Sequence, residues 1–149
     1  MSTRIGTCGR CDATTRALKP LFVNTIRTGA LSMFTAATLA AARQLGTPLV
    51  CVFTKSGFSA RVVASHRPPV PILALTDTQK TARQLALVWG VVPELVAHQH
   101  SYEEMIGVAL EAAVKRELVV PGDRVVVTAG VPFDEPGTTN TMKVEVVPR

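Results

Sequence analysis

Four short, almost continuous apolar runs alternate with helix-like segments, and this alternation limits the folds open to the chain more than any other feature. The runs are LVCVF (49–53), ILAL (72–75), VVPELV (91–96) and RVVVTAG (124–130). A strand that is apolar at nearly every position is typical of a sheet that is covered on both faces. Strands that alternate with helices predict an α/β protein whose sheet is mostly parallel.

The segments on either side of the first strand predict two helices. Residues 31–45 are rich in alanine, a strong helix former, and Gly46 with Pro48 ends the pattern. The predicted core face of this helix holds Leu31, Phe34, Ala41 and Leu45. After the strand, Ser59 is expected to cap a short helix that reaches about Ser65.

Two further helices are predicted in the second half. Asp77 or Thr78 is expected to cap the first of them. Its apolar stripe is Ala82, Leu85, Ala86 and Trp89, which places the tryptophan in the core. Ser101 and Glu104 match a capping box at the start of the second. The residues that this second helix is predicted to bury are Ile106, Ala109, Leu110 and Ala113.

The end of the chain predicts a fifth strand. TMKVEVV (141–147) alternates between apolar and polar residues, as expected of a strand that is open on one face. The loop before it, 131–139, makes a hairpin with the fourth strand the simplest connection. The pattern as a whole therefore predicts an α/β sandwich that is mostly parallel and is closed by a hairpin.

Length and charge exclude several classes of protein. With 149 residues the chain is long enough for one domain with a substantial core. The net charge is +5, but the basic residues do not cluster and few aromatic residues lie among them, which argues against a nucleic-acid partner. Since no apolar run approaches the 18 or more residues of a membrane span, we expect no membrane partner.

The first 29 residues have no sustained periodicity and are interpreted as a weakly ordered leader, with the domain proper at 30–149. The odd number of cysteines, Cys8, Cys11 and Cys51, favours a reducing compartment, and we expect a cytoplasmic protein. The basic, threonine-rich leader is also typical of transit peptides, so organelle targeting is the alternative. CGRC at 8–11 lacks the strand and the further ligands that a redox or zinc site would need. No metal site is expected.

The loop that follows the first strand carries the strongest signal for a ligand. Thr54, Lys55, Ser56 and Ser59 supply hydroxyl groups and one positive charge, and Gly57 lets the backbone approach a ligand closely. The loop leads into a helix N-terminus, which favours an anion. In an open α/β sheet, ligands bind beyond the carboxyl ends of the strands, where the strand order reverses. If the first and fourth strands are neighbours, this loop faces the one that follows the fourth strand, which contributes Gly130, Gly137, Thr138 and Thr139.

Several blocks of the sequence together resemble the C-terminal domain of pyruvate kinases. They are FTKSGFSARVVASHRPPVPILALT, TARQLALVWGVVPELV and GDRVVVTAGVPFDEPGTTNTMKVEVV, in the same order and spacing over roughly 35–147. The resemblance implies a three-layer α/β/α sandwich around a five-stranded mixed sheet whose last strand is antiparallel. It also implies a regulatory domain that binds a phosphorylated allosteric effector and takes part in oligomerisation.

The same resemblance implies an effector site. The family's phosphate loop corresponds here to Thr54, Lys55, Ser56, Gly57 and Ser59, and its flexible effector loop to 130–139. Phe58 stands where bisphosphate-activated animal forms carry arginine. A sugar monophosphate or AMP is therefore a better expected ligand than a bisphosphate.

Phosphoryl transfer in the family takes place in a β/α barrel with Mg²⁺ and K⁺, and the sequence contains no such barrel. We therefore expect no catalytic residue and no cofactor in this chain, which would act as a piece or a stand-alone relative of the enzyme that converts phosphoenolpyruvate and ADP to pyruvate and ATP. The alternative is an assembly module without a ligand, which associates with itself or with a catalytic barrel through its last strand. A small independent enzyme would need an acid and base pair near the loop, and none is present in the sequence there.

Overall fold

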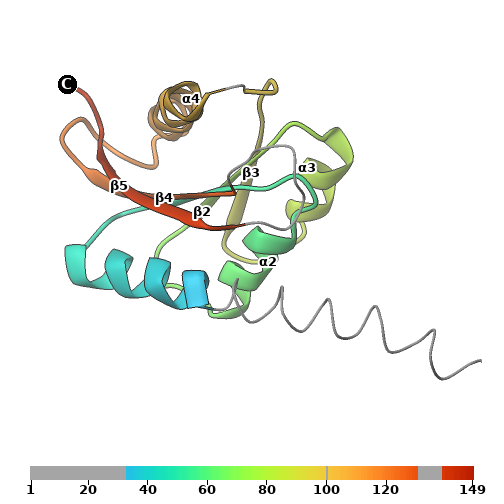
Figure 1. The fold of residues 1–149 in the computed structure, drawn as a ribbon, viewed down its shortest axis with the longest axis horizontal. Helices are drawn as coiled ribbons and strands as arrows, with labels where there is room; N and C mark the ends of the chain where they lie inside the picture. The colour runs from blue at the N-terminus through green and yellow to red at the C-terminus, as the bar shows by residue number, and fades with distance from the viewer. Residues whose placement is uncertain (1–32, 100, 131–138) are drawn as a thin grey trace, which may run out of the picture.

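The computed structural model describes residues 33–99, 101–130 and 139–149, and within them a single five-stranded sheet organises the chain (Figure 1). The strands are β1 (Val50–Phe53), β2 (Ile72–Thr76), β3 (Val91–Leu95), β4 (Arg124–Ala129) and β5 (Thr141–Val146). Their order is β3-β2-β1-β4-β5, with β5 antiparallel to β4 and the other neighbours parallel. The predicted α/β class and the mixed sheet with an antiparallel last strand are confirmed.

Helices cover both faces of the sheet. They are a helix over 33–45, α2 (Phe58–Ser65), α3 (Gln79–Leu85) and α4 (Tyr102–Lys115). The first three pack against one face, where Leu39, Val63 and Leu85 meet Val52 and Ile72. α4 covers the opposite face and is the uppermost helix in Figure 1. The result is the predicted α/β/α sandwich.

Alternation along the central strand explains why both faces are apolar. Val50 and Val52 belong to the core under the first three helices, whereas Leu49 and Cys51 belong to the core under α4. All four are fully buried. A strand buried on both faces needs this continuous apolar run, so the run in the sequence and the central position in the sheet have the same cause.

Three predicted core positions are wrong, because Leu45, Ala86 and Trp89 are exposed. In the helix over 33–45 the buried face is formed by Thr35, Thr38, Leu39 and Ala42, whereas Leu45 is 40% exposed. The face can be partly polar because the Thr38 hydroxyl donates to the Phe34 carbonyl at 2.8 Å. Trp89 is 71% exposed, because α3 ends at Leu85 and the residues after it no longer follow the helical stripe.

The helix starts are predicted in part. Ser101 is the N-cap of α4, and its hydroxyl accepts from the Glu104 backbone N–H at 3.2 Å. Thr78 is the N-cap of α3, although its side chain makes no capping bond. Ser59 is not a cap: α2 begins at Phe58, and its N-cap is Gly57 in the left-handed conformation.

The proposed leader, 1–29, and the loop over 131–138 lie outside the described residues. The same holds for Cys8, Cys11, His100, Asp134 and Glu135. No helix in the described part of the chain has the length and hydropathy that a membrane crossing needs.

Candidate functional site

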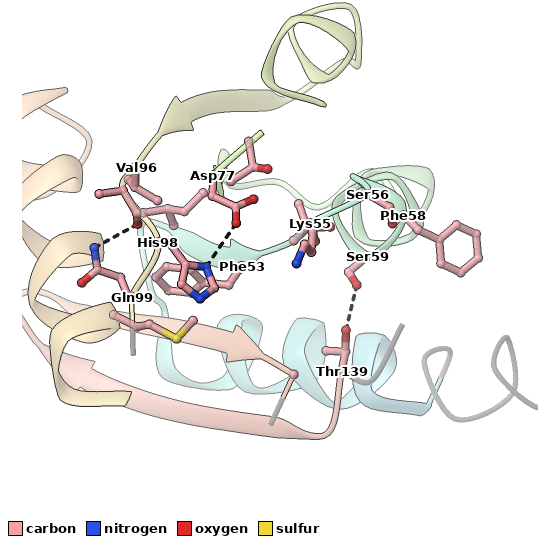
Figure 2. Close-up of a pocket in the computed structure, with 16 residues that line it drawn as sticks. Phe53, Lys55, Ser56, Phe58, Ser59, Asp77, Val96, His98, Gln99 and Thr139 are labelled. Carbon is pink, nitrogen blue, oxygen red and sulfur yellow. Dashed lines mark hydrogen bonds and ion pairs between the residues drawn. The ribbon is translucent and has the colours of Figure 1, made fainter. Parts of the chain in front are cut away.

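The strand order brings the loop after β1 beside the residues that follow β4, because β1 and β4 are neighbours, the condition under which the sequence predicts the ligand site there. In the sheet, β2 lies on one side of β1 and β4 lies on the other. The direction in which successive strands are added therefore reverses between β1 and β4. A pocket of about 110 Å³ opens at this edge of the sheet, well above the space that a single water requires. It is lined by Phe53, Thr54, Lys55, Ser56, Phe58, Ser59, Leu75, Thr76, Asp77, Val96, Ala97, His98, Gln99, Met105, Gly130 and Thr139 (Figure 2).

Hydrogen bonds from two directions hold the loop after β1. The Thr54 hydroxyl accepts from the Gly57 backbone N–H at 3.0 Å, which closes a tight turn. The Thr81 hydroxyl, from α3, donates to the Lys55 carbonyl at 2.9 Å. The loop between Thr54 and α2 is therefore fixed in place before any ligand arrives.

Gly57 is required at the turn for two reasons. Its φ of +77° lies in the left-handed region, which side chains disfavour. A Cβ atom there would also lie 3.1 Å from Thr81 Cγ2 and 3.3 Å from Leu85 Cδ2. Gly57 is buried behind the loop and does not itself line the pocket.

Two predicted site residues from opposite ends of the domain meet across the pocket mouth. The hydroxyl groups of Ser59, in the first turn of α2, and Thr139, just before β5, lie 2.7 Å apart (Figure 2). Ser59 is buried, whereas Lys55 and Ser56 are exposed. Thr54, Lys55, Ser56, Ser59, Gly130 and Thr139 are thus brought to one pocket, and Gly137 and Thr138 lie outside the described residues.

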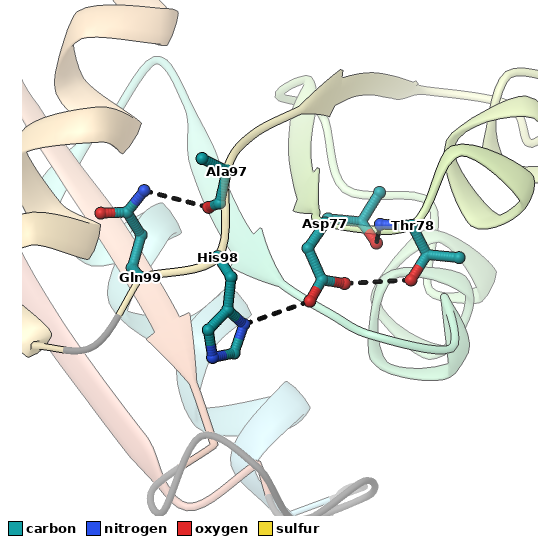
Figure 3. Close-up of polar contacts among 6 residues, drawn as sticks. Asp77, Thr78, Ala97, His98 and Gln99 are labelled. Carbon is teal, nitrogen blue, oxygen red and sulfur yellow. Dashed lines mark hydrogen bonds and ion pairs between the residues drawn. The ribbon is translucent and has the colours of Figure 1, made fainter.

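The pocket also contains a pair of side chains that sequence reasoning missed. Asp77 follows β2 and His98 follows β3, and Asp77 Oδ2 lies 3.2 Å from His98 Nδ1 (Figure 3). The other carboxylate oxygen of Asp77 accepts from the Thr78 hydroxyl at 3.0 Å. The sequence predicted only a helix cap at 77 or 78. Both residues follow predicted strands, and this position was the signal that could have placed them in the site.

The surroundings of Asp77 favour its charged form. Partial burial would raise the pKa of this carboxyl group, but hydrogen bonds from Thr78 and His98 and the charges of Lys55 and His98 outweigh it, and the pKa is lowered. Asp77 is therefore ionised at neutral pH. The pocket carries one permanent positive and one permanent negative charge among its described residues, on Lys55 and Asp77.

The remaining wall of the pocket is apolar. Phe53, Leu75, Val96 and Met105 line it beneath the polar groups. Such a surface suits the organic part of a ligand, while the hydroxyl groups and Lys55 suit an anion. Within the described ranges, no group of three or more His, Cys, Asp or Glu side chains could hold a metal ion. Cys51 is fully buried in the core under α4, and this burial raises the pKa of its thiol to about 12.

The chain is closely related to one known protein family over most of its length. The sequence profile of the family "Pyruvate kinase, alpha/beta domain" matches residues 33–145. The chain is 49% identical over 94 residues to the pyruvate kinase of Geobacillus stearothermophilus, a match that covers 63% of this chain and 16% of that protein. The identity is 44% over 100 residues with the enzyme of Agrobacterium vitis (67% and 21%) and 41% over 110 residues with that of Clostridium acetobutylicum (74% and 23%). The match therefore spans about a fifth of the length of these relatives.

Proposed function

This chain belongs to the pyruvate kinase family through its C-terminal α/β domain, and we propose that it binds the phosphate group of a regulatory metabolite in the pocket at the carboxyl ends of β1 and β4. The observation that carries the proposal is the convergence of six polar or glycine positions, from 54–59 and from 130 and 139, on that one pocket. By itself the domain acts as a binding and assembly unit, and the conversion of phosphoenolpyruvate to pyruvate belongs to the parent enzyme.

Each group in the pocket has a defined role toward a phosphate. Lys55 supplies the positive charge, and the hydroxyl groups of Ser56, Ser59 and Thr139 supply hydrogen bonds. The free N–H groups in the first turn of α2 add a favourable dipole. Thr54 holds the turn through its bond to the Gly57 N–H. Because the loop is already formed, little ordering is required when a ligand binds.

A phosphate monoester is the proposed ligand class, as the family resemblance implies. Phe58 is 43% exposed at the pocket rim and offers no charge to a second phosphate. Lys55 is the one lysine or arginine among the described residues that line the pocket. A sugar monophosphate or AMP fits one cation and an apolar wall better than a bisphosphate does.

Thermal melts test the proposal directly. The chain is melted alone and with millimolar AMP, glucose 6-phosphate or ribose 5-phosphate. A ligand that binds only the folded state at a hundred times its Kd adds about 2.7 kcal/mol, which raises the Tm by roughly 5 to 10 °C for a domain of this size. Lys55→Ala should remove most of the shift, whereas Lys80→Ala, on the exposed side of α3, should leave it unchanged.

A second variant probes the hydroxyl groups. Ser56→Asp places a negative charge at the proposed phosphate position and should weaken binding by more than tenfold through repulsion. Ser56→Ala should cost less, because it removes one hydrogen bond and adds no charge. If Ser56→Asp binds the monophosphates as tightly as the native chain, the loop is not the phosphate site.

The exposed apolar row on β5 favours a second candidate function, assembly. Met142, Val144 and Val146 are exposed. They lie on the face of the sheet that the helix over 33–45 covers, since Val144 pairs with Val126, which belongs to the core under that helix. We propose that this strand contacts a second copy of the chain or a pyruvate kinase barrel. Self-association without any response to phosphate esters would favour assembly as the sole role.

A further inference from the structure

The pocket has two chemically distinct ends, set by the order of the strands. At this edge of the sheet the residues next to the strand ends are His98, Asp77, Lys55, Gly130 and Thr139, in the order β3-β2-β1-β4-β5. Thr139 precedes its strand, because β5 is antiparallel to the others. The hydroxyl groups and Lys55 gather at the β1–β4 end, while the ionised carboxylate and the histidine lie at the β2–β3 end (Figure 2). Neighbouring strands are about 4.8 Å apart, so a small phosphorylated metabolite is long enough to reach from one end to the other.

The apolar wall decides which way the organic part of a ligand extends. Leu75, Val96 and Met105 lie toward β2, β3 and α4, whereas β4 and β5 contribute only Gly130 and Thr139 among the described lining residues. With a phosphate on Lys55 and Ser59, the remainder of the ligand therefore lies over the apolar wall. It then passes the carboxylate of Asp77.

Asp77 retains capacity for further hydrogen bonds. One of its oxygens accepts from Thr78 and the other is paired with His98. An ionised carboxylate has about four acceptor sites, so it can still accept from hydroxyl groups of a ligand. The bond to His98 holds the carboxylate in a fixed orientation at the pocket wall (Figure 3).

From this arrangement we propose that Asp77 is the specificity-determining residue of the pocket, accepting hydrogen bonds from a hydroxylated phosphate monoester and rejecting a ligand that carries a second phosphate at its far end. The inference rests on the proposed function, since it assigns the ligand class of the same site. A second phosphate would lie within about 10 Å of the carboxylate, two strand spacings, and the repulsion at that range lowers affinity by roughly tenfold or more.

The test compares two ligands on matched variants. Calorimetric titration gives the Kd of glucose 6-phosphate and of fructose 1,6-bisphosphate for the native chain, Asp77→Asn and Glu111→Gln. Glu111 lies exposed on α4 and does not line the pocket, so its variant changes the net charge equally. We expect the native chain to prefer the monophosphate. In Asp77→Asn the ratio of the two affinities should move about tenfold or more toward the bisphosphate, and in Glu111→Gln it should stay within twofold.

The outcomes separate this inference from the proposed function. If the native chain binds glucose 6-phosphate but the ratio of the two affinities is unchanged in Asp77→Asn, the role of Asp77 is overturned. The proposed phosphate site is not affected by that result. Failure of the native chain to bind any phosphate monoester overturns both. If Asp77→Asn does not melt cooperatively, Asp77→Ser is used in its place. It removes the same charge, and the same change in the ratio of the two affinities is expected.

Discussion

At the scale of single residues, Gly57 has the strongest constraint in the candidate site. Its N–H donates to Thr54, its left-handed φ directs the chain into α2, and its missing side chain lets α3 approach. Thr81 and Leu85 of α3 would contact any Cβ atom placed there. The turn that positions Lys55 and Ser59 thus depends on a residue that does not touch the pocket.

Gly57→Ala is expected to destabilise the fold by about 2 kcal/mol or more, because the left-handed conformation alone costs an alanine about 1 to 2 kcal/mol and the contact with Thr81 adds to it. Urea denaturation followed by circular dichroism measures the change. Gly107→Ala in α4 is the control. A Cβ atom at 107 meets nothing within 4 Å, so alanine there should stabilise the helix by about 0.5 to 1 kcal/mol. Equal effects at the two positions would contradict the role given to Gly57.

At the scale of secondary structure, the N-terminus of α4 supports one wall of the pocket. The chain leaves β3, passes through His98 and Gln99, and enters the helix at Ser101. Gln99 donates from its amide to the Ala97 carbonyl at 3.0 Å (Figure 3). The Ser101 hydroxyl accepts from the Glu104 N–H. Glu103 and Glu104 place negative charge in the first turn, where the helix dipole favours it.

Ser101→Ala should lower the free energy of unfolding by about 1 kcal/mol, the usual cost of removing a capping hydroxyl. Ser101→Asp keeps an acceptor at the same place and should stay close to the native value. The measurement is again urea denaturation. A loss in the aspartate variant as large as in the alanine variant would show that the hydrogen bond to Glu104 is not what the hydroxyl contributes.

At the scale of the whole molecule, the sheet ends in an edge that is apolar on one face. β5 pairs with β4 on one side, and none of the described residues forms a strand on its other side. Val146 is 56% exposed, and Met142 and Val144 lie in the same row. Exposed edges of this kind invite pairing with another chain, and the exposed Arg124 of β4 pairs with Val146 at the end of the row.

The assembly candidate therefore predicts that the mass of the native chain in solution rises with concentration, and that Val146→Lys abolishes the rise by placing a charge on the edge. Light scattering after gel filtration measures the mass. Gln79→Lys, exposed at the start of α3, adds the same charge away from β5 and should associate like the native chain. A native chain that is monomeric at every concentration contradicts self-association.

The succession of strands and helices could be predicted from the sequence, and so could the content of the loop after β1. These properties are local: an apolar run of the right length reports a buried strand, and Gly57 among hydroxyl groups reports a tight turn, wherever the chain goes next. The sequence left the strand order open: it placed the candidate site on the condition that the first and fourth strands are neighbours, and the structure meets that condition.

The sequence could not predict which side chains share the pocket or which apolar residues are covered, because both depend on how the elements pack. Asp77 and His98 meet because β2 and β3 are neighbours, a relation between segments 21 positions apart that no local pattern reports. Trp89 is exposed because α3 ends early, and Leu45 because a different helix face meets the sheet. Periodicity describes one element at a time, whereas burial and pocket membership depend on what packs against it.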